Sequence, residues 1–192
     1  MSDELTRRIG NTLKTLRQEK SWSLTRAAEE TGVSKAMLGQ IERGESSPTV
    51  ATLWKIATGM NVAFSSFIEP TLADEGVTYR SGAGSSFREN EAGMHVVPLF
   101  PFDEKLRFDM LVIELAAGAS STSSAHESGV IEHIIVLEGQ LEMTVDGQTH
   151  VLSAGDALRF AADREHRYHN PADTTARFHD LIHYPDNKYP PA

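Results

Sequence analysis

The sequence predicts a protein of two domains, an all-helical domain followed by an antiparallel β-barrel or β-sandwich. Three features of the 192-residue chain lead to this prediction. Apolar residues recur at intervals of three and four up to about residue 68, as in amphipathic helices. From about residue 94, short β-rich runs alternate with Gly, Asp and Asn turns. All eight histidines lie in this second part, at or after His95.

The net charge of −9 is divided unevenly between the two parts. Residues 1–70 carry nine Lys and Arg against eight Asp and Glu, whereas residues 71–192 carry nine against nineteen. Basic residues such as Arg8, Arg17 and Arg26 can therefore line one face of the first part and meet a polyanion, which the acidic second part would repel.

The chain contains no cysteine, which excludes disulfides, thiolate metal sites and a cysteine nucleophile. No apolar run is long enough to cross a membrane, and no charged-then-apolar signal segment opens the sequence. We therefore expect a soluble, cytoplasmic protein with no membrane partner.

Five helices are expected in residues 1–70. Ser47 and Pro48 have the character of a cap and a first-turn residue for the fourth helix, which Gly59 would end. Residues 64–68 would form a short fifth helix that closes the core. The first helix is predicted by an apolar stripe made of Leu5, Ile9, Leu13 and Leu16.

The middle of this domain has the pattern of two short helices joined by a tight turn. Ser23 and Ser34 are good N-caps, because a serine hydroxyl can accept from an otherwise unpaired backbone N–H. Gly32 lies where the first of the two helices should end. Leu38 and Ile41 would face inward from the second helix. This arrangement places the second helix in a DNA major groove.

The outer face of the second helix carries side chains suited to DNA. Gln40 can form a bidentate pair with adenine, and Met37 and Ala36 can contact a thymine methyl group. Lys35, at the start of the helix, is better placed for a phosphate. The expected DNA-binding residues are Ser23, Ser34, Lys35, Ala36, Met37, Gln40 and Arg43.

The run from Gln40 to Gly44, followed by residues 46–49, resembles the recognition helix and exit loop of the XRE family of helix-turn-helix proteins. The resemblance implies a five-helix, lambda-repressor-like domain over residues 1–70 that binds a double-stranded DNA operator. Residues 71–76 would be a linker, and residues 77–192 the second domain. The run VSKAMLGQIERGESSPTVATLWKIATG and the ending FHDLIHYP resemble bacterial regulators linked to sulfur utilisation, which implies a sulfur-containing amino acid or related metabolite as effector.

Six β-rich runs mark the second domain, and Asp146-Gly147 after the fourth is a strong hairpin signal, because both positions tolerate positive φ. A further strand would then pass through Val151. Such spacing indicates an antiparallel barrel or sandwich. The predicted strands cover residues 94–100, 106–115, 131–137, 141–145, 157–161 and 176–184.

Two segments of this domain resemble the paired motifs of the cupin family of small jelly-roll β-barrels. His126 precedes Glu132, and a glycine follows seven residues after that glutamate. His166 follows Gly155-Asp156, with Asn170 four positions later. The resemblance implies that His126, Glu132 and His166 hold a divalent metal such as Zn, Ni, Mn or Fe(II).

The family's second histidine is replaced by Ser128, so an alternative stays open in which the barrel holds no metal. The two histidines would then be polar groups of a purely organic ligand pocket. Strand alternation would place Ser128 on the same face as Glu132, and a bulge at Gly129 would swing His133 inward as a reserve ligand. The expected ligand-binding residues are Ser128, His133, Arg159 and Tyr168.

The two motif sets together indicate a DNA-binding transcriptional regulator, and not an enzyme, whose barrel senses a small-molecule effector. Specific operator binding usually needs two recognition helices about 34 Å apart, so we expect a homodimer. The alternative is a cupin metalloenzyme of the dioxygenase or isomerase type fused to a DNA-binding domain. Two histidines and a glutamate could carry Fe(II) for that purpose.

Overall fold

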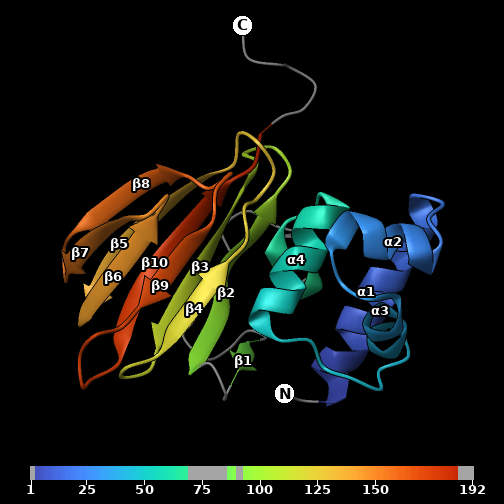
Figure 1. The fold of residues 1–192 in the computed structure, drawn as a ribbon, viewed down its shortest axis with the longest axis horizontal. Coiled ribbons are helices and arrows are strands. Elements are labelled where there is room, and N and C mark those ends of the chain that lie inside the picture. The colour runs from blue at the N-terminus through green and yellow to red at the C-terminus, as the bar shows by residue number, and fades with distance from the viewer. Residues whose placement is uncertain (1–2, 69–85, 90–92, 186–192) are drawn as a thin grey trace, which may run out of the picture.

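The computed structural model describes residues 3–68, 86–89 and 93–185, in which a helical domain lies against one end of a two-sheet β domain (Figure 1). The predicted linker and the predicted boundary at residue 77 fall outside the described residues, so they stay predictions. No helix in the described part of the chain is long and apolar enough to span a membrane.

The helical domain contains four α-helices and one short 3-10 helix within residues 3–68. The prediction of a five-helix domain therefore holds for the four α-helices, whereas the predicted short fifth helix is a 3-10 helix of only four residues, FSSF. The elements are α1 (Asp3–Glu19), α2 (Leu24–Thr31), α3 (Lys35–Glu42), α4 (Val50–Met60) and η1 (Phe64–Phe67).

The caps of α2 and α3 agree with the sequence prediction. The Ser23 hydroxyl accepts from the backbone N–H of Arg26, and the Ser34 hydroxyl accepts from that of Met37. Gly32 ends α2 in the left-handed conformation, with φ of 65°. The α2–turn–α3 unit is thus defined by local interactions of its own sequence.

The ends of α4 differ from the prediction. Its N-cap is Thr49, whose side chain accepts from the backbone N–H of Thr52, and its C-cap is Asn61, in the left-handed conformation. Gly59 lies inside the helix instead of ending it. A Cβ atom at Gly59 would lie 2.5 Å from the Cα atom of Thr31, so glycine is needed there for α4 to pack closely against α2.

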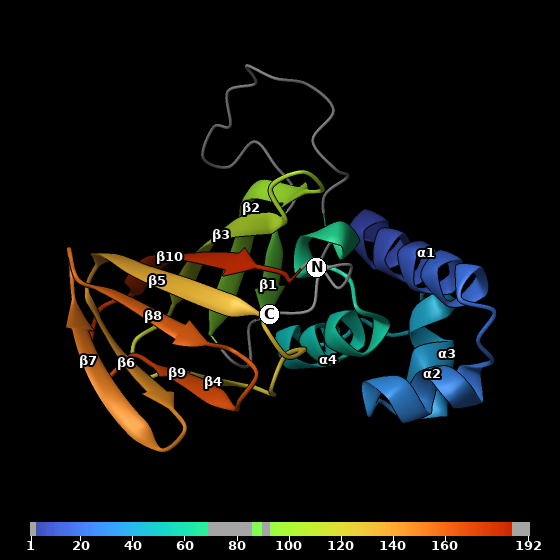
Figure 2. The ribbon, with the colours of Figure 1, turned by 90° about the horizontal axis from the view of Figure 1, so that it is seen from above.

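The β domain consists of two antiparallel sheets that face each other (Figure 2). The six-stranded sheet has the order β1-β2-β3-β10-β5-β8, and the four-stranded sheet has the order β4-β9-β6-β7. The strands are β1 (Phe87–Glu89), β2 (Met94–Asp103), β3 (Phe108–Leu115), β4 (Ser120–Ser123), β5 (Ile131–Glu138), β6 (Gln140–Val145), β7 (Gln148–Ser153), β8 (Ala157–Ala161), β9 (His166–His169) and β10 (Ala176–His183).

The strands predicted from β-rich runs all form, and the hairpin between β6 and β7 turns at Asp146 and Gly147, with φ of 49° and 76°. The sequence prediction missed β1, β4 and β9. These strands have three or four residues each, and β4 consists of Ser and Thr alone, so they carry little apolar periodicity.

The two domains share a continuous apolar core at the end of the barrel nearest α4 and η1. The indole of Trp54 stacks on Phe64 at a ring distance of 4.3 Å, and Phe64 meets Phe87 of β1 edge-on at 6.5 Å. Ser65 adds polar contacts, because its hydroxyl accepts from the backbone N–H of Phe102 at 2.9 Å. The helical domain is therefore packed on the barrel through specific contacts.

Candidate functional sites on α3 and inside the barrel

The helix α3 presents one side to the solvent and the other to the core. Leu38 and Ile41 are fully buried, as predicted. The exposed side carries Lys35, Met37 and Gln40, and 36% of the Met37 surface is accessible. Ala36, Ser34 and Ser23 are also exposed. The residues predicted to read DNA thus lie where a duplex can reach them.

The basic residues predicted to contact DNA differ in how they are placed: some are exposed, and others are bound to groups within the protein. The guanidinium of Arg43 is exposed and donates to both carboxylate oxygens of Glu45, at 2.8 and 2.6 Å. This hydrogen-bonded pair raises the pKa of Arg43. The expectation that Arg8 and Arg17 line a DNA-facing surface is not met, since Arg8 donates to the Ile68 carbonyl and Arg17 is largely buried.

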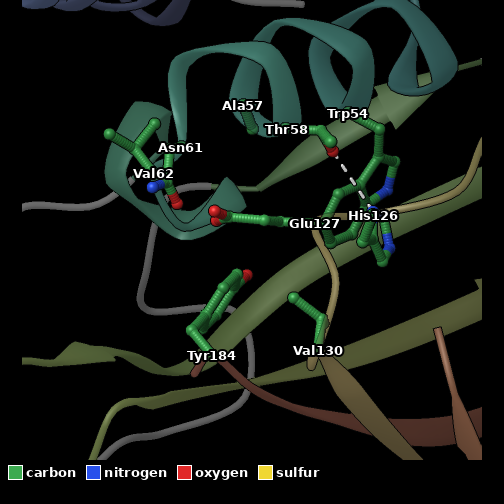
Figure 3. Close-up of a pocket in the computed structure, with 9 residues that line it drawn as sticks. All are labelled: Trp54, Ala57, Thr58, Asn61, Val62, His126, Glu127, Val130 and Tyr184. Atoms are coloured by element: carbon green, nitrogen blue, oxygen red, sulfur yellow. Dashed lines mark hydrogen bonds between the residues drawn. The ribbon is translucent and has the colours of Figure 1, made fainter. Parts of the chain in front are cut away.

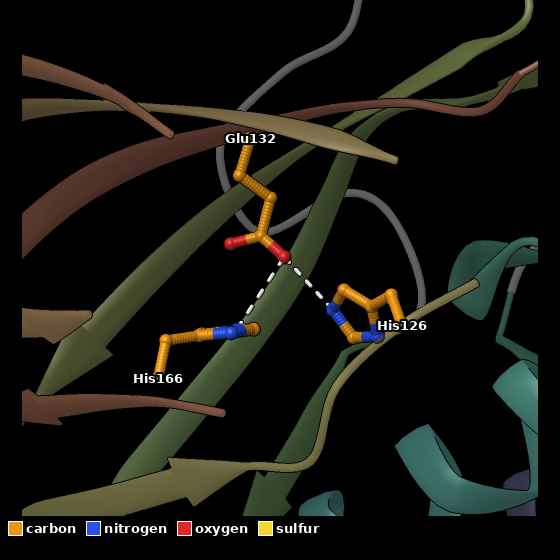
Figure 4. Close-up of side chains that lie close together, drawn as sticks. All are labelled: His126, Glu132 and His166. Carbon is orange, nitrogen blue, oxygen red and sulfur yellow. Dashed lines mark ion pairs between the residues drawn. The ribbon is translucent and has the colours of Figure 1, made fainter. Parts of the chain in front are cut away.

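Three buried side chains converge inside the barrel near its helical end (Figure 4). His126 comes from the loop before β5, Glu132 from β5, and His166 from the start of β9. The Nε2 atom of His126 lies 2.8 Å from Oε1 of Glu132, and Nε2 of His166 lies 3.5 Å from the same oxygen. The side chains are 5%, 1% and 0% exposed, in chain order.

The residues fit a divalent metal ion. Both Nε2 atoms and the Glu132 Oε1 atom are buried and make no hydrogen bond within the described residues. Two imidazoles and one carboxylate form a donor set that Zn, Ni, Mn and Fe(II) all accept.

The outer atoms of the three side chains are each held by another group, as metal ligands usually are. The Nδ1 atom of His166 lies 2.9 Å from the Arg164 carbonyl, so Nδ1 carries the proton and Nε2 has a free lone pair. The Tyr168 hydroxyl donates to Glu132 Oε2 at 2.8 Å, which leaves Oε1 for a metal. The Nδ1 atom of His126 lies 3.2 Å from the Thr58 hydroxyl.

The carboxyl group of Glu132 is completely buried yet favours its charged form. Burial pushes its pKa upward, but the close contacts with the His126 and His166 rings and the hydrogen bond from the Tyr168 hydroxyl together hold the pKa below the ordinary value. An ionised carboxylate is the form that binds a metal.

Two further buried carboxyl groups lie in the same sheet as Glu132, one on β10 next to β5 and one on β3, the strand beyond β10. Burial raises the pKa of Asp180 on β10 well above its ordinary value, and the negative charges of Glu132 and Asp109 raise it further. Burial also raises the pKa of Asp109 on β3 to about 6, against the hydrogen bonds from Ser65 and Tyr184. No motif in the sequence singles out either aspartate.

The structure separates the four residues predicted to bind a ligand. Tyr168 is buried beside Glu132, where a pocket wall was expected. Ser128 is exposed in a turn, because the chain becomes a strand only at Ile131. His133 faces away from Glu132, because residues on a strand alternate and β5 pairs regularly with β10 from Ile131 to Val136, with its register shift only after that point. Arg159 is exposed on the outer side of β8, so its predicted inward role is wrong.

A small pocket opens between α4 and the mouth of the barrel, next to the candidate metal centre (Figure 3). His126 forms part of its wall and connects it to the site inside the barrel. Sequence reasoning missed the contribution of α4, because the cupin-like motifs give no signal for a residue in another domain. The lining consists of Trp54, Ala57, Thr58, Asn61, Val62, His126, Glu127, Val130 and Tyr184.

Known families and proteins match both halves of this structure. The family described as "Helix-turn-helix" matches residues 13–67, and the family described as "Cupin domain" matches residues 111–182. The chain therefore belongs to the XRE-type helix-turn-helix transcriptional regulators that carry a C-terminal cupin domain.

Individual relatives match over nearly the whole chain. The HTH-type transcriptional regulator SutR of Escherichia coli is 52% identical, over 95% of this chain and 98% of that protein. The regulator PuuR of the same organism is 25% identical, over 84% of this chain and 86% of that protein. The crystal structure of an HTH_3 family transcriptional regulator from Vibrio cholerae matches with a TM-score of 0.81 and 38% identity, over 97% of this chain and all of that one.

Proposed function

We propose that this transcriptional regulator binds a double-stranded DNA operator through α3 and senses a small metabolite in its cupin domain, with a divalent metal held by His126, Glu132 and His166. The observation that carries the proposal is the convergence of three buried donor atoms without hydrogen-bond partners, two imidazole nitrogens and one carboxylate oxygen. The metal would supply open coordination positions for a donor atom of the effector.

The effector is proposed to be a sulfur-containing amino acid or a related metabolite. The resemblance of residues 33–59 and of the ending FHDLIHYP to sulfur-utilisation regulators supports this class. The small pocket between α4 and the barrel adjoins the metal centre, because His126 forms part of its wall. Tyr184 and Glu127 in its wall offer polar groups beside an apolar surface.

The protein is proposed to act as a homodimer. One helix-turn-helix unit contacts only a short stretch of DNA, so two copies are needed to read two half-sites about one helical turn apart. An effector that binds one arrangement of the two copies more tightly than another would change operator occupancy.

The test begins with operator selection from random duplexes by the purified full-length protein loaded with Zn²⁺. Affinity for the selected duplex is then measured with and without cysteine, methionine and homocysteine, with serine as the control that lacks sulfur. A reproducible shift with a sulfur compound and none with serine is expected. If selection recovers no preferred sequence, the proposed operator binding is contradicted. If none of the sulfur compounds changes the affinity for the selected duplex, the proposed effector class is contradicted.

The same samples test the enzymatic alternative. Fe(II)-loaded protein is incubated with these amino acids in the presence of oxygen, and substrate and product are followed by chromatography. A sensor should bind a compound and release it unchanged. If the wild type steadily consumes a compound and His166→Ala does not, the protein would instead be a metalloenzyme.

A further inference from the structure

We propose that Thr58 of the DNA-binding domain positions the metal ligand His126, so that loading of the metal centre is coupled to the placement of that domain. This inference rests on the metal site of the proposed function and adds the route by which the site acts on DNA binding. Thr58 would not touch the metal; it would act through the imidazole ring of His126.

His126, one of the three candidate metal ligands in the barrel, is hydrogen-bonded to the helical domain. The Thr58 Oγ1 atom on α4 lies 3.2 Å from His126 Nδ1 (Figure 3). The two residues are 68 positions apart in the chain. His166 and Glu132, in contrast, are held by groups of the barrel itself, the Arg164 carbonyl and the Tyr168 hydroxyl. Of the three, His126 is thus the ligand that α4 can influence.

The two nitrogen atoms of the His126 ring have different partners. Nε2 of His126 faces Glu132, at 2.8 Å, and Nδ1 faces Thr58. A neutral histidine whose Nε2 binds a metal carries its proton on Nδ1. Nδ1 must then donate, and the Thr58 hydroxyl is the acceptor placed for it. Metal binding at Nε2 would therefore make His126 Nδ1 the donor and the Thr58 hydroxyl the acceptor of this hydrogen bond. It would thus favour the arrangement in which α4 keeps the Thr58 hydroxyl within hydrogen-bonding distance of His126.

His126 also packs on α4. Its ring lies 4.9 Å from that of Trp54, at an angle of 38°. Trp54 itself stacks on Phe64 of η1, at 4.3 Å. The position of the His126 ring is therefore tied to two elements of the helical domain, by one hydrogen bond and by continuous ring packing.

α4 is itself connected to the DNA-contacting unit. The close approach at Gly59 leaves no space for a methyl group between α4 and the backbone of Glu30 and Thr31 at the end of α2. α2 continues through the turn at Gly32 into α3. A shift of α4 relative to the barrel would consequently move α2 and α3 with it, because closely packed backbones cannot slide independently. Such a contiguous chain of contacts is the physical route that coupling requires.

The experiment measures metal affinity and operator affinity of the full-length protein, with Zn²⁺ or Co²⁺ alone as the probe. Thr58→Val removes the hydroxyl and keeps the shape of the side chain, whereas Thr58→Ser keeps the hydroxyl. Thr144→Val, in an exposed hydroxyl pair with Thr149 on the far sheet, is the matched control for the same substitution. Loss of an outer partner of a metal ligand typically lowers metal affinity by about 10- to 100-fold.

We expect Thr58→Val to bind metal about tenfold more weakly, with Thr58→Ser and Thr144→Val close to the wild type. In the wild type, metal should change operator affinity by about fivefold or more, and Thr58→Val should reduce this change towards onefold. By linkage, the operator duplex should alter metal affinity by the same factor in the wild type. Unchanged metal affinity and unchanged coupling in Thr58→Val would overturn the proposal.

A measurement on the wild type keeps the proposal testable even if Thr58→Val folds poorly. Nitrogen-15 spectra of the histidine rings should show His126 with its proton on Nδ1 and protected from solvent once Zn²⁺ is added. A His126 ring that binds metal through Nδ1, or whose Nδ1 proton exchanges freely, would refute the role of Thr58. If the wild type binds no metal at all, the metal site of the proposed function is wrong. If it binds metal with an affinity that Thr58→Val does not change, only the role of Thr58 is wrong.

Discussion

Arg17 on α1 holds Glu42 on α3 through two parallel hydrogen bonds, from Nε to Oε1 at 2.6 Å and from the second terminal nitrogen to Oε2 at 2.9 Å. A third bond runs from the same guanidinium to the Trp22 carbonyl at 2.9 Å. The two side chains are 15% and 9% exposed, so the pair is shielded from water. This pair fixes the end of α3 against α1, and it explains why Arg17 is not available to DNA.

Arg17→Met should therefore destabilise the helical domain, by about 1–3 kcal/mol, because it leaves the Glu42 carboxylate without its partner in a largely buried position. The free energy of unfolding from urea titration checks this value. Pairing the change with Glu42→Gln should recover part of the loss, since no unpaired charge remains. Additive losses in the double variant would show that the pair contributes little beyond its separate side chains.

Gln40→Ala should lower affinity for the selected operator by about 1–3 kcal/mol and leave nonspecific binding nearly unchanged, because a glutamine in the groove reads one base pair. Binding to operator and to scrambled duplex, measured by fluorescence anisotropy at a fixed salt concentration, separates the two effects. Gln148→Ala, at an exposed position of β7, is the matched control. Equal losses on both duplexes would contradict a base-reading role.

Lys35→Ala should act differently from Gln40→Ala, because a lysine on a phosphate contributes through counterion release. We expect weaker binding to both duplexes and a reduction of the salt dependence by about one unit of log–log slope. A series of binding constants at increasing salt concentration measures the slope. Lys105→Ala, exposed in the β domain, should leave it unchanged; an unaltered slope in Lys35→Ala would remove Lys35 from the interface.

His166→Ala should lose most of the bound metal, because it removes one of three donors from a buried site. Metal content of protein purified after Zn²⁺ loading, determined by mass spectrometry, measures the effect. His133→Ala is the matched control, as this histidine lies on the other face of β5. Equal metal content in wild type, His166→Ala and His133→Ala would indicate adventitious surface binding and leave the barrel as an organic pocket.

Asp109 should make the docking of the two domains depend on pH. Its carboxylate accepts from the Ser65 backbone N–H at 3.2 Å and from the Tyr184 hydroxyl, so it lies at the junction of η1 and the barrel. Its folded pKa is raised to about 6. The folded state then binds more protons than the unfolded chain between pH about 4 and about 6, and the stability contribution of Asp109 falls as pH rises through this range.

The matching experiment is a comparison with Asp109→Asn, which keeps an oxygen acceptor but cannot titrate. The stability of the wild type minus that of the variant should fall by about 2–3 kcal/mol between pH 4 and pH 7. Chemical denaturation at a series of pH values provides the difference, in which the contributions of all other groups cancel. A difference that stays constant over the whole range would show that Asp109 does not titrate with a raised pKa.

The features that the sequence predicted correctly depend on interactions between near neighbours. The caps of α2 and α3, the left-handed Gly32 and the hairpin at Asp146-Gly147 follow from residues within four positions of one another. The separation of buried Leu38 from exposed Gln40 follows from the period of a single helix. Propensity and periodicity describe such short-range features well.

The errors concern features that a distant part of the chain decides. Pro48 and Gly59 resemble the ends of a helix, yet α4 runs from Val50 to Met60, because Thr49 and Asn61 cap it and Gly59 serves the contact with α2. Arg159 and His133 could have faced either side of their strands until the pairing of β5 with β8 fixed the register. A shift of one residue would have reversed both orientations.

The sequence by itself determined the helix-turn-helix unit, the antiparallel β domain and the motif spacing that singles out His126, Glu132 and His166. Only the tertiary structure brought Thr58 to His126 and Ser65 to Asp109, across 68 and 44 positions of the chain. Periodicity within one segment carries no information about such pairs. They form because burying the apolar surface around Trp54 and Phe64 packs the helical domain on the barrel, and this packing places polar groups of α4 and η1 beside those of the cupin domain.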